Sequence, residues 1–354
     1  MTASETLRNA GGSMVSGENS MNPVASNFGA IDESPRLTRP LERLAVQLTV
    51  FCNLKCKMCS VWEMRELGVP LPVAKQLLAD AYRLGARTFV PFGAENFTRK
   101  DFIDIVEHAH ELGYTFQAIV TNGTMISDQH LERLSRTTSI RLNISIDGPR
   151  EIHDELRGAG NFDKSVATAR ECVRRKIAVS FSGVILRETL PHLSALIDLA
   201  AKVGVTDVSL QPFQVEISGL HKDVARFSLR SVERDSIALA LTKLCEYAAS
   251  RKITVYTEGL FGVIPDYLLY GKRPIPTGGC LLPSTMLLVD RLGDVYPCFF
   301  MVKERDRMGN VYRDRLPDIW HSRIHKQLQM LALAERCPGC LAACSDVQSF
   351  TENA

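Results

Sequence analysis

From residue 40 onward, short apolar runs alternate with longer segments in which apolar residues recur every three or four positions. The short runs are β-rich and end in polar or Gly-containing turns, which is typical of buried strands. Six strands are predicted, at residues 45–50, 88–93, 116–122, 140–147, 177–186 and 205–213. Amphipathic helices are predicted between them, at residues 72–85, 99–113, 127–136, 162–176 and 190–204.

This alternation predicts an α/β fold built from βαβ units, with a parallel sheet. Right-handed crossovers would roll six such units into an open or partial barrel. The rhythm ends after about residue 213. A long helix is expected at 231–250, followed by the Gly/Pro-rich stretch 271–280 and a hairpin-like segment at 286–298 that turns at Leu-Gly-Asp.

The same pattern divides the chain into four expected parts. Residues 1–39 are rich in Ser, Gly, Asn and Ala, have no hydrophobic period, and are expected to be a disordered extension. Residues 40–230 form the partial barrel, 231–274 a linking helical region, and 275–354 a small α+β domain.

Composition excludes several classes of function. The 354 residues are 45% hydrophobic and carry a net charge of +2, so neither nucleic acid nor a membrane surface is an expected partner. No run of 18 apolar residues predicts a membrane span, and the N-terminus lacks the apolar core of a signal peptide. A cytoplasmic location is expected.

The ten cysteines fall mainly into two groups, one near each end of the chain. They lie at positions 52, 56, 59, 172, 245, 280, 298, 337, 340 and 344. Thiols this close together would make strained disulfides, and in a reducing compartment such clusters are more often metal ligands or redox groups. Cys172 and Cys245 lie within helical patterns and are expected to be core thiols.

The first group, Cys52, Cys56 and Cys59, directly follows the first predicted strand. A structural zinc site needs four protein ligands, and no histidine lies nearby to complete one. Three cysteines suit a [4Fe–4S] cluster in which one iron has no protein thiolate and can bind a small chelating molecule. A zinc knuckle or three merely buried thiols are the alternatives.

This CxxxCxxC motif after the first barrel strand resembles that of the radical S-adenosylmethionine (SAM) superfamily. The resemblance implies that the three cysteines ligate a [4Fe–4S] cluster whose fourth iron is chelated by SAM. Reductive cleavage of SAM would then give a 5′-deoxyadenosyl radical that abstracts a hydrogen atom from the substrate. Met58 stands where the family usually has an aromatic residue near the adenine, and could serve through a sulfur–aromatic contact.

Further segments carry the same resemblance. GAENFTRKDF (93–102) resembles the family's Gly-Gly-Glu segment, which implies that Glu95 meets the amino group of SAM. Ala94 replaces the second glycine, at a cost if that position needs a positive φ. The alternative for Glu95 is an acid at a helix N-terminus, favoured by the helix dipole.

VTNGT (120–124) and SIDGPREIHDELRG (145–158) resemble the branch of the family that has a C-terminal cluster domain. The resemblance implies that Ser145 lies near the SAM ribose or carboxylate and that Arg157 pairs with the carboxylate. It also makes Asn122 a candidate SAM contact, although a turn or cap role fits equally well. Asp-Gly-Pro at 147–149 reads as a turn.

The second cysteine group resembles the SPASM/twitch extension, in which a hairpin and a helix hold auxiliary [4Fe–4S] clusters. Five cysteines suffice for one fully ligated cluster. Cys280, Cys298, Cys337 and Cys340 are the preferred ligands, and Cys344 competes for one place. A four-cysteine zinc site is the alternative.

The resemblance implies a radical SAM enzyme, most simply an oxidoreductase, without naming its substrate. A small molecule of natural-product or antibiotic biosynthesis (a sugar, an aminocyclitol or a nucleoside) is the favoured substrate, for dehydrogenation, epimerisation or decarboxylation. The alternative is a peptide- or protein-modifying maturase, and the third hypothesis is a non-catalytic iron–sulfur protein. A reductant protein such as flavodoxin or ferredoxin is an expected partner. No residue can be assigned as the catalytic acid or base.

Overall fold

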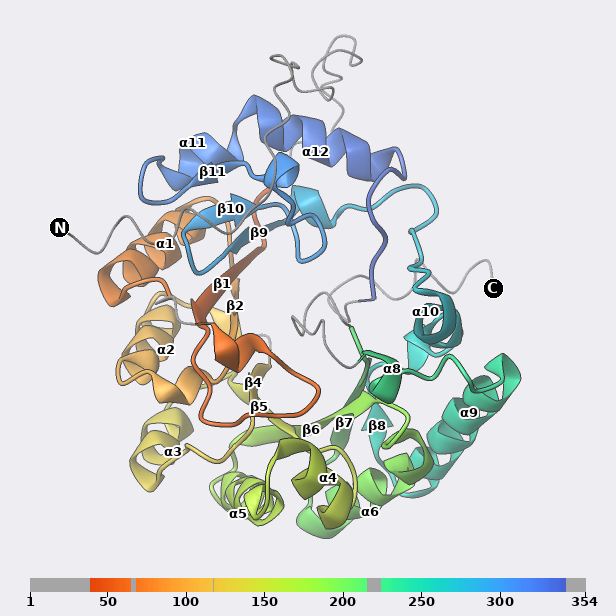
Figure 1. Ribbon diagram of the computed structural model, residues 1–354. Helices are drawn as coiled ribbons and strands as arrows, with labels where there is room; N and C mark the ends of the chain where they lie inside the picture. The colour runs from red at the N-terminus through yellow and green to blue at the C-terminus, as the bar shows by residue number, and fades with distance from the viewer. Residues whose placement is uncertain (1–38, 65–67, 117, 215–223, 342–354) are drawn as a thin grey trace, which may run out of the picture. The chain divides into compact units, whose positions relative to one another are not determined.

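Two β-sheets form the framework, one of six strands in the order β11-β10-β9-β1-β2-β3 and one of five in the order β4-β5-β6-β7-β8 (Figure 1). The computed structural model describes residues 39–64, 68–116, 118–214 and 224–341. All of these belong to one compact unit, Pro35–Ala354. Residues 1–38 of the predicted disordered extension (1–39) and Cys344 lie outside the described residues.

Strands β1 to β8 run parallel to their sequence neighbours within each sheet, as predicted. Their bounds are β1 Arg43–Thr49, β2 Thr88–Gly93, β3 Thr115–Phe116, β4 Ile119–Thr121, β5 Arg141–Ser145, β6 Ala178–Ile185, β7 Asp207–Pro212 and β8 Thr254–Val255. The predicted strand 116–122 is divided between the two sheets, because β3 pairs with β2 whereas β4 pairs with β5.

The helices connect successive strands, and in Figure 1 α1, α2, α3, α5 and α6 lie outside the strands. Their bounds are α1 Leu71–Arg83, α2 Phe102–Glu111, α3 Asp128–Ser135, α4 Arg150–Arg157, α5 Asn161–Arg174, α6 Leu193–Val203, α8 Val224–Phe227, α9 Arg234–Ser250, α10 Ile264–Tyr270, α11 Leu316–Trp320 and α12 Arg323–Leu333. Short 3-10 turns include η2 Asn96–Thr98 and η5 Leu282–Ser284. The five helices predicted between the strands are present, and α4 is an additional one.

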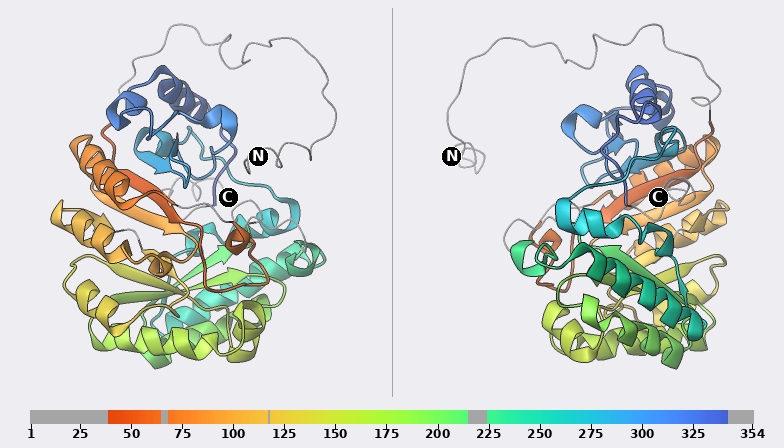
Figure 2. Two further views of the ribbon diagram at one scale, coloured as in Figure 1. Left: turned by 60° about the vertical axis from the view of Figure 1, so that its left-hand side comes forward. Right: turned by 90° about the vertical axis from the view of Figure 1, so that its right-hand side faces the viewer.

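The C-terminal hairpin extends the first sheet. Strands β9 (Met286–Val289) and β10 (Asp294–Tyr296) pair antiparallel, as the sequence predicts, and β11 (Gly309–Asn310) follows. Strand β9 also pairs in parallel with β1, in the register Arg43↔Met286 to Val46↔Val289. The views in Figure 2 agree with this pairing. An edge of β1 that would otherwise present unpaired backbone groups is therefore covered by the C-terminal segment.

Within the described part of the chain, no helix is long and apolar enough to cross a bilayer.

Candidate functional site

The first cysteine group lies on the loop that joins β1 to α1, at the carboxyl end of the parallel strands. Asn53 of this loop accepts a hydrogen bond from Asn122 Nδ2 at 2.9 Å and donates one to Thr124 Oγ1 at 2.8 Å. The Lys57 N–H donates to the carbonyl of Leu156 in α4 at 2.8 Å. These bonds attach the loop both to the segment after β4 and to α4. They hold the three thiols at the carboxyl end of the strands, where the active sites of βα barrels lie.

A small apolar cluster, separate from the main core, surrounds the loop. Its buried members come from the loop and from segments that follow β5, β6 and β7; they are Leu54, Cys56, Met58, Leu156, Leu186, Phe213 and Phe227. Cys52 and Cys59 pack against it. Met58 is only 5% exposed, so the loop is anchored by apolar contacts on the side that faces the ends of the strands.

The three thiols are close enough to influence one another's ionisation. Burial, together with smaller contributions from Cys56, Glu95 and Cys59 and against the effect of the Leu54 N–H, raises the pKa of Cys52 to about 11. Burial likewise raises the pKa values of Cys56 and Cys59, whereas the positive charge of Arg157 lowers both. Metal binding at this loop must therefore displace protons from neutral thiols.

Glu95 is a buried carboxylate, only 1% exposed. Its oxygens accept hydrogen bonds from Thr121 Oγ1 at 2.8 Å, Asn122 N at 2.7 Å and Phe97 N at 3.3 Å. Among the described residues it forms no ion pair. Burial raises its pKa, against the effect of these donors. A buried carboxylate without a cation is costly unless a positive group joins it, and an ammonium group fits that need.

The segment before Glu95 requires glycine at one position and not at the next. Gly93 has φ +142°, and a Cβ atom there would lie 2.2 Å from the backbone oxygen of Thr49. Ala94 has no positive φ and donates its N–H to the same oxygen at 3.0 Å. Alanine in place of the second glycine therefore carries no backbone strain, so the cost considered from the sequence is absent.

Arg157 forms a buried ion pair with Asp147. Arg157 Nε donates to Asp147 Oδ2 at 2.5 Å and Nη2 donates to Oδ1 at 3.3 Å, while the Asp147 side chain is fully buried. Asp147 Oδ1 also accepts the Val184 N–H at 3.1 Å, and His153 Nδ1 accepts the Asp147 N–H at 3.3 Å. Asp147 therefore joins β5, β6 and α4, and it holds the Arg157 guanidinium near Cys56 and Cys59.

The other two predicted contacts also face this end of the barrel. Asn122 Nδ2 approaches Cys52 Sγ at 3.9 Å, in addition to its bond with Asn53. Ser145 is the last residue of β5, is 8% exposed, and its hydroxyl forms no hydrogen bond with the described residues. The structure thus gathers Met58, Glu95, Asn122, Ser145 and Arg157 around the cysteine loop or at the adjacent strand ends.

The second cysteine group gathers four thiols from three segments. Burial raises the pKa of Cys280 to about 11, and Cys337 and Cys340 contribute to this rise. Burial also raises the pKa of Cys298, and Cys340 and Cys280 again contribute. Gly339 has φ +78°, and a Cβ atom there would lie 2.7 Å from Arg273 Cβ and 2.9 Å from backbone oxygens. This glycine lets the backbone between Cys337 and Cys340 approach the preceding segment closely.

The donor sets of the two cysteine groups fit iron–sulfur clusters. Among the described residues, no three His, Cys, Asp or Glu side chains stand close enough to hold one metal ion. Cysteine thiolates are the ligands that hold iron–sulfur clusters, so both cysteine groups have the chemistry that such a cluster needs. Three thiols beside an unpaired buried carboxylate also match an open cluster iron with a chelating amine next to it.

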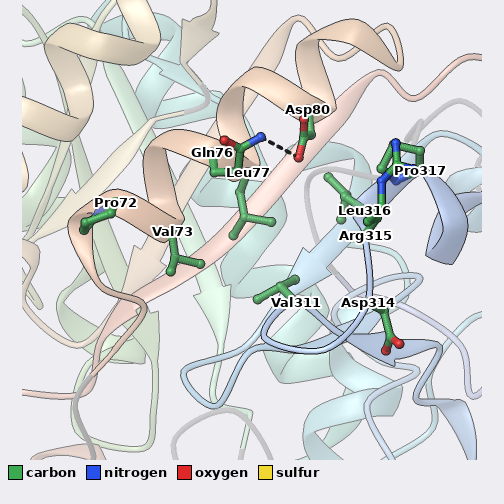
Figure 3. Close-up of a pocket in the computed structure, with 10 residues that line it drawn as sticks. All are labelled: Pro72, Val73, Gln76, Leu77, Asp80, Val311, Asp314, Arg315, Leu316 and Pro317. Atoms are coloured by element: carbon green, nitrogen blue, oxygen red, sulfur yellow. Dashed lines mark hydrogen bonds between the residues drawn. The ribbon is translucent and has the colours of Figure 1, made fainter.

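A pocket of about 510 Å³ lies elsewhere, between α1 and the segment that leads into α11 (Figure 3). Its lining residues are Pro72, Val73, Gln76, Leu77, Asp80, Val311, Asp314, Arg315, Leu316 and Pro317. None of them belongs to a cysteine group or to the segments around Glu95 and Arg157, so the chemistry and this pocket are separate.

Sequence reasoning missed two residues of the first site. Asp147 reads as a turn residue, yet it is fully buried and pairs with Arg157. Asn53 lies between the first two cysteines and forms the bridge to Asn122. For Asp147 the sequence did hold a signal, because a charged residue there closes an apolar strand. In a parallel sheet this position lies at the carboxyl ends of the strands, where binding sites form.

Comparison with protein families gives two matches. The radical SAM superfamily matches residues 46–200. The SPASM iron–sulfur cluster-binding domain matches residues 280–344, which include the second cysteine group.

Among curated proteins, the mycofactocin maturase MftC of Mycobacterium tuberculosis is 28% identical over 328 residues, 86% of this chain and 79% of the relative. The AdoMet-dependent heme synthase of Oleidesulfovibrio alaskensis is 27% identical over 296 residues, 78% of this chain and 74% of the relative.

Solved structures share the fold. Streptococcus suis SuiB bound to S-adenosylmethionine superposes with a TM-score of 0.66 at 16% identity, covering 89% of this chain and 75% of SuiB. The anSMEcpe enzyme with bound AdoMet and a Cp18Cys peptide gives a TM-score of 0.65 at 20% identity, covering 83% of this chain and 84% of that one.

Proposed function

Since the chain belongs to the radical SAM superfamily and carries a C-terminal SPASM iron–sulfur domain, we propose that it is a maturase that modifies a peptide. Its cofactors are the radical SAM [4Fe–4S] cluster, SAM and auxiliary iron–sulfur clusters. The proposal concerns the substrate, because fold and cofactor do not determine it.

The observation that carries the proposal is the kind of protein to which this chain is similar. MftC is named a maturase. SuiB has also been solved bound to its precursor peptide SuiA, and anSMEcpe with a peptide. These similarities favour the peptide alternative over the small molecule expected from the sequence. The heme synthases keep a small-molecule substrate as the second candidate, since they are similar over a comparable length.

We assign the first cluster to Cys52, Cys56 and Cys59. These residues would hold the cluster and SAM, which together would supply the radical chemistry for removing a hydrogen atom from the substrate. The apolar cluster around Met58 anchors the loop through its buried residues Leu54, Cys56 and Met58. Asn122 and Asn53 hold the loop against the segment after β4, which fixes the position of Cys52.

Glu95 and Arg157 would orient SAM through its two charged groups. The Glu95 carboxylate, already oriented by Thr121 and Asn122, receives the ammonium group, whose positive charge removes the cost of burying the carboxylate. The Arg157 guanidinium uses Nε and Nη2 for Asp147, which leaves Nη1 for the SAM carboxylate. Ser145 offers its hydroxyl at the end of β5.

The auxiliary site would use Cys280, Cys298, Cys337 and Cys340, with Cys344 as the further thiol of the same segment. A cluster held by these cysteines would supply electron transfer at this end of the chain, which is the chemistry that a net oxidation would need. A small electron-transfer protein such as flavodoxin or ferredoxin would deliver the electron that reduces the first cluster.

Co-expression tests the proposal. The enzyme is produced with each short open reading frame that flanks its gene, and the peptides are analysed by mass spectrometry. One peptide should change mass with the wild type and stay unchanged with the Cys52→Ala/Cys56→Ala/Cys59→Ala variant. The proposal fails if no such peptide changes while a small molecule from the host extract is consumed with release of 5′-deoxyadenosine.

A further inference from the structure

The inner face of strands β4 to β7 is lined by small polar side chains. Along β5 and β6, fully buried apolar residues alternate with polar ones. The polar set is Asn143, Ser145, Ser180, Ser182, Ser209 and Gln211. Closed eight-stranded barrels fill the interior with bulky branched side chains, whereas this face of the partial barrel carries small polar ones.

Two glycines show which side of the strands faces the helices. A Cβ atom on Gly183 would lie 3.1 Å from Leu196 of α6 and 3.3 Å from Leu210. A Cβ atom on Gly123 would lie 3.2 Å from Ile144 and 3.4 Å from Ser165 of α5. Leu210 and Ile144 therefore point toward the helices. Since side chains alternate along a strand, the polar set points to the opposite side, into the barrel.

The strand register places these residues in rows across the sheet. Val120, Asn143 and Ser180 form one row. Ser145, Ser182 and Ser209 form the next row, closer to the cysteine loop. Val184 and Gln211 follow in a third row. Val120 is 50% exposed although β4 is covered by helices on its other side, so the inner side of this row is open to solvent.

The wall is uncharged and has unused hydrogen-bonding capacity. Ser180 donates to Asn143 Oδ1 at 3.2 Å, and Gln211 Nε2 donates to Ser209 Oγ at 3.0 Å. Within the described residues, no partner engages the Asn143 amide N–H groups, the Ser182 hydroxyl or Gln211 Oε1. The only charged side chains on this face of β4 to β7 are Arg141 and Asp207, and they pair with each other at 2.9 Å at the far end of the barrel.

The wall is continuous with the proposed cofactor site. Ser145 ends the middle row, and the chain reaches Asp147 two residues later. Leu186, just after β6, and Phe213, just after β7, both belong to the apolar cluster around Met58. A ligand that lies along the serine rows would therefore have one end, at the carboxyl ends of the strands, next to the cysteine loop.

We propose that this wall, Asn143, Ser180, Ser182, Ser209 and Gln211, binds the uncharged backbone amides of the peptide segment to be modified. The inference rests on the proposed function for the identity of the occupant. Neutral donors and acceptors match peptide N–H and C=O groups, whereas a charged substrate group would be buried here without a counter-charge. Amides along the wall would place the reacting residue beside the cysteine loop.

Saturation-transfer NMR on the reconstituted holoenzyme tests the wall with a defined probe, N-acetylglycine methylamide, which needs no knowledge of the natural substrate. The probe should give a signal with the wild type, and acetate and methylammonium should give none. Asn143→Leu and Ser182→Ala should each weaken probe binding roughly five- to tenfold, the effect of losing about one hydrogen bond. Ser182→Thr, which keeps the hydroxyl, should restore it.

The matched control is Ser135→Ala, an exposed serine on the outer helix α3, which should leave binding unchanged. The melting temperature of each variant confirms that the fold persists. Equal probe binding by Asn143→Leu, Ser182→Ala and the wild type would overturn the assignment, and so would equally strong binding of acetate or methylammonium. Probe binding that depends on the wall, together with failure of the co-expression experiment, would overturn the peptide substrate and retain a neutral amide site.

Discussion

Replacing Asp147 by asparagine should destabilise the protein strongly, because it breaks a buried ion pair without changing its shape. The Asp147 side chain is fully buried and that of Arg157 is 12% exposed. Asparagine retains one oxygen for the Val184 N–H but presents no negative charge to the guanidinium. Removing one partner of a buried pair typically costs about 3–5 kcal/mol. We expect about 3 kcal/mol, since Arg157 keeps a small exposed fraction.

A similar ion pair at the surface provides the control. Glu107 receives two bonds from Arg133, at 2.8 and 2.5 Å, but the two side chains are 38% and 31% exposed. Because solvent screens such a pair, Glu107→Gln should cost less than about 1 kcal/mol. Arg133 also pairs with Asp104 at 2.6 Å, so it keeps a counter-charge when Glu107 becomes neutral. The comparison therefore contrasts a buried arginine that has one carboxylate with a half-exposed arginine that has two.

Anaerobic urea unfolding, followed by the fluorescence of the two tryptophans, measures both variants. The free-energy change is the shift in midpoint multiplied by the slope of the transition. A cost for Asp147→Asn no greater than that for Glu107→Gln would refute the reasoning, because Arg157 would then not depend on Asp147 as a counter-charge.

Three further predictions concern the surroundings of the first cysteine group. Gly93→Ala should destabilise by roughly 3 kcal/mol or more, because of its positive φ and a contact of 2.2 Å; Gly262→Ala, which meets nothing within 4 Å, should be nearly neutral in the same unfolding assay. Asn122→Asp replaces an N–H group near Cys52 Sγ by a negative charge and should lower the reduction potential of the first cluster, as measured by EPR-monitored redox titration; an unchanged potential would contradict the contact. Burial lowers the pKa of His153 to about 4, so the unfolded chain binds the extra proton between about pH 6.5 and 4, and stability should fall by about 3 kcal/mol as pH decreases across that window. His153→Gln should flatten this part of the pH profile.

The parallel strands could be predicted from the sequence because their signal is local. A strand buried on both faces, or lined by small polar residues on one face, still begins after a polar turn and ends before one. The predicted strand 88–93 matches β2 at both ends. The prediction of the next strand, at 116–122, was less accurate. Strands β3 and β4 together occupy 115–121, and they belong to different sheets. The hydrophobic pattern of these seven residues does not show where one strand ends and the other begins.

Helix α4 could not be predicted from hydrophobic periodicity. Its residues 150–157 are mostly charged, and only Ile152 and Leu156 are apolar. The signals that were present are the Pro149 cap before the helix and Gly158 directly after it, with φ +103°. The helix is also stabilised by the Lys57 N–H, which donates to the carbonyl of Leu156 at 2.8 Å. This contact comes from a distant part of the chain that a sequence window does not contain.

The sequence did not predict where the C-terminal hairpin, which leads into Cys298, lies relative to the barrel strands. Its position matters for how two clusters could act together. Strand β1 pairs with β2 on one side and with β9 on the other, and it leads directly into the first cysteine group. Gln47 Oε1 of β1 also accepts the N–H of Arg291 in the hairpin turn at 3.2 Å.

Phe92, at the end of β2, packs edge-on against Phe299, the residue after Cys298, with 5.1 Å between ring centroids. Backbone pairing and this aromatic contact therefore fix the segment that carries Cys298 against the strands that lead into Cys52 and Glu95. A cluster on a flexible tether would sample many distances from the first site, whereas a cluster bound to a paired strand keeps one. A fixed separation gives electron transfer between the two sites one distance and hence one rate, so the β1–β9 pairing is compatible with the electron-transfer role proposed for the second site.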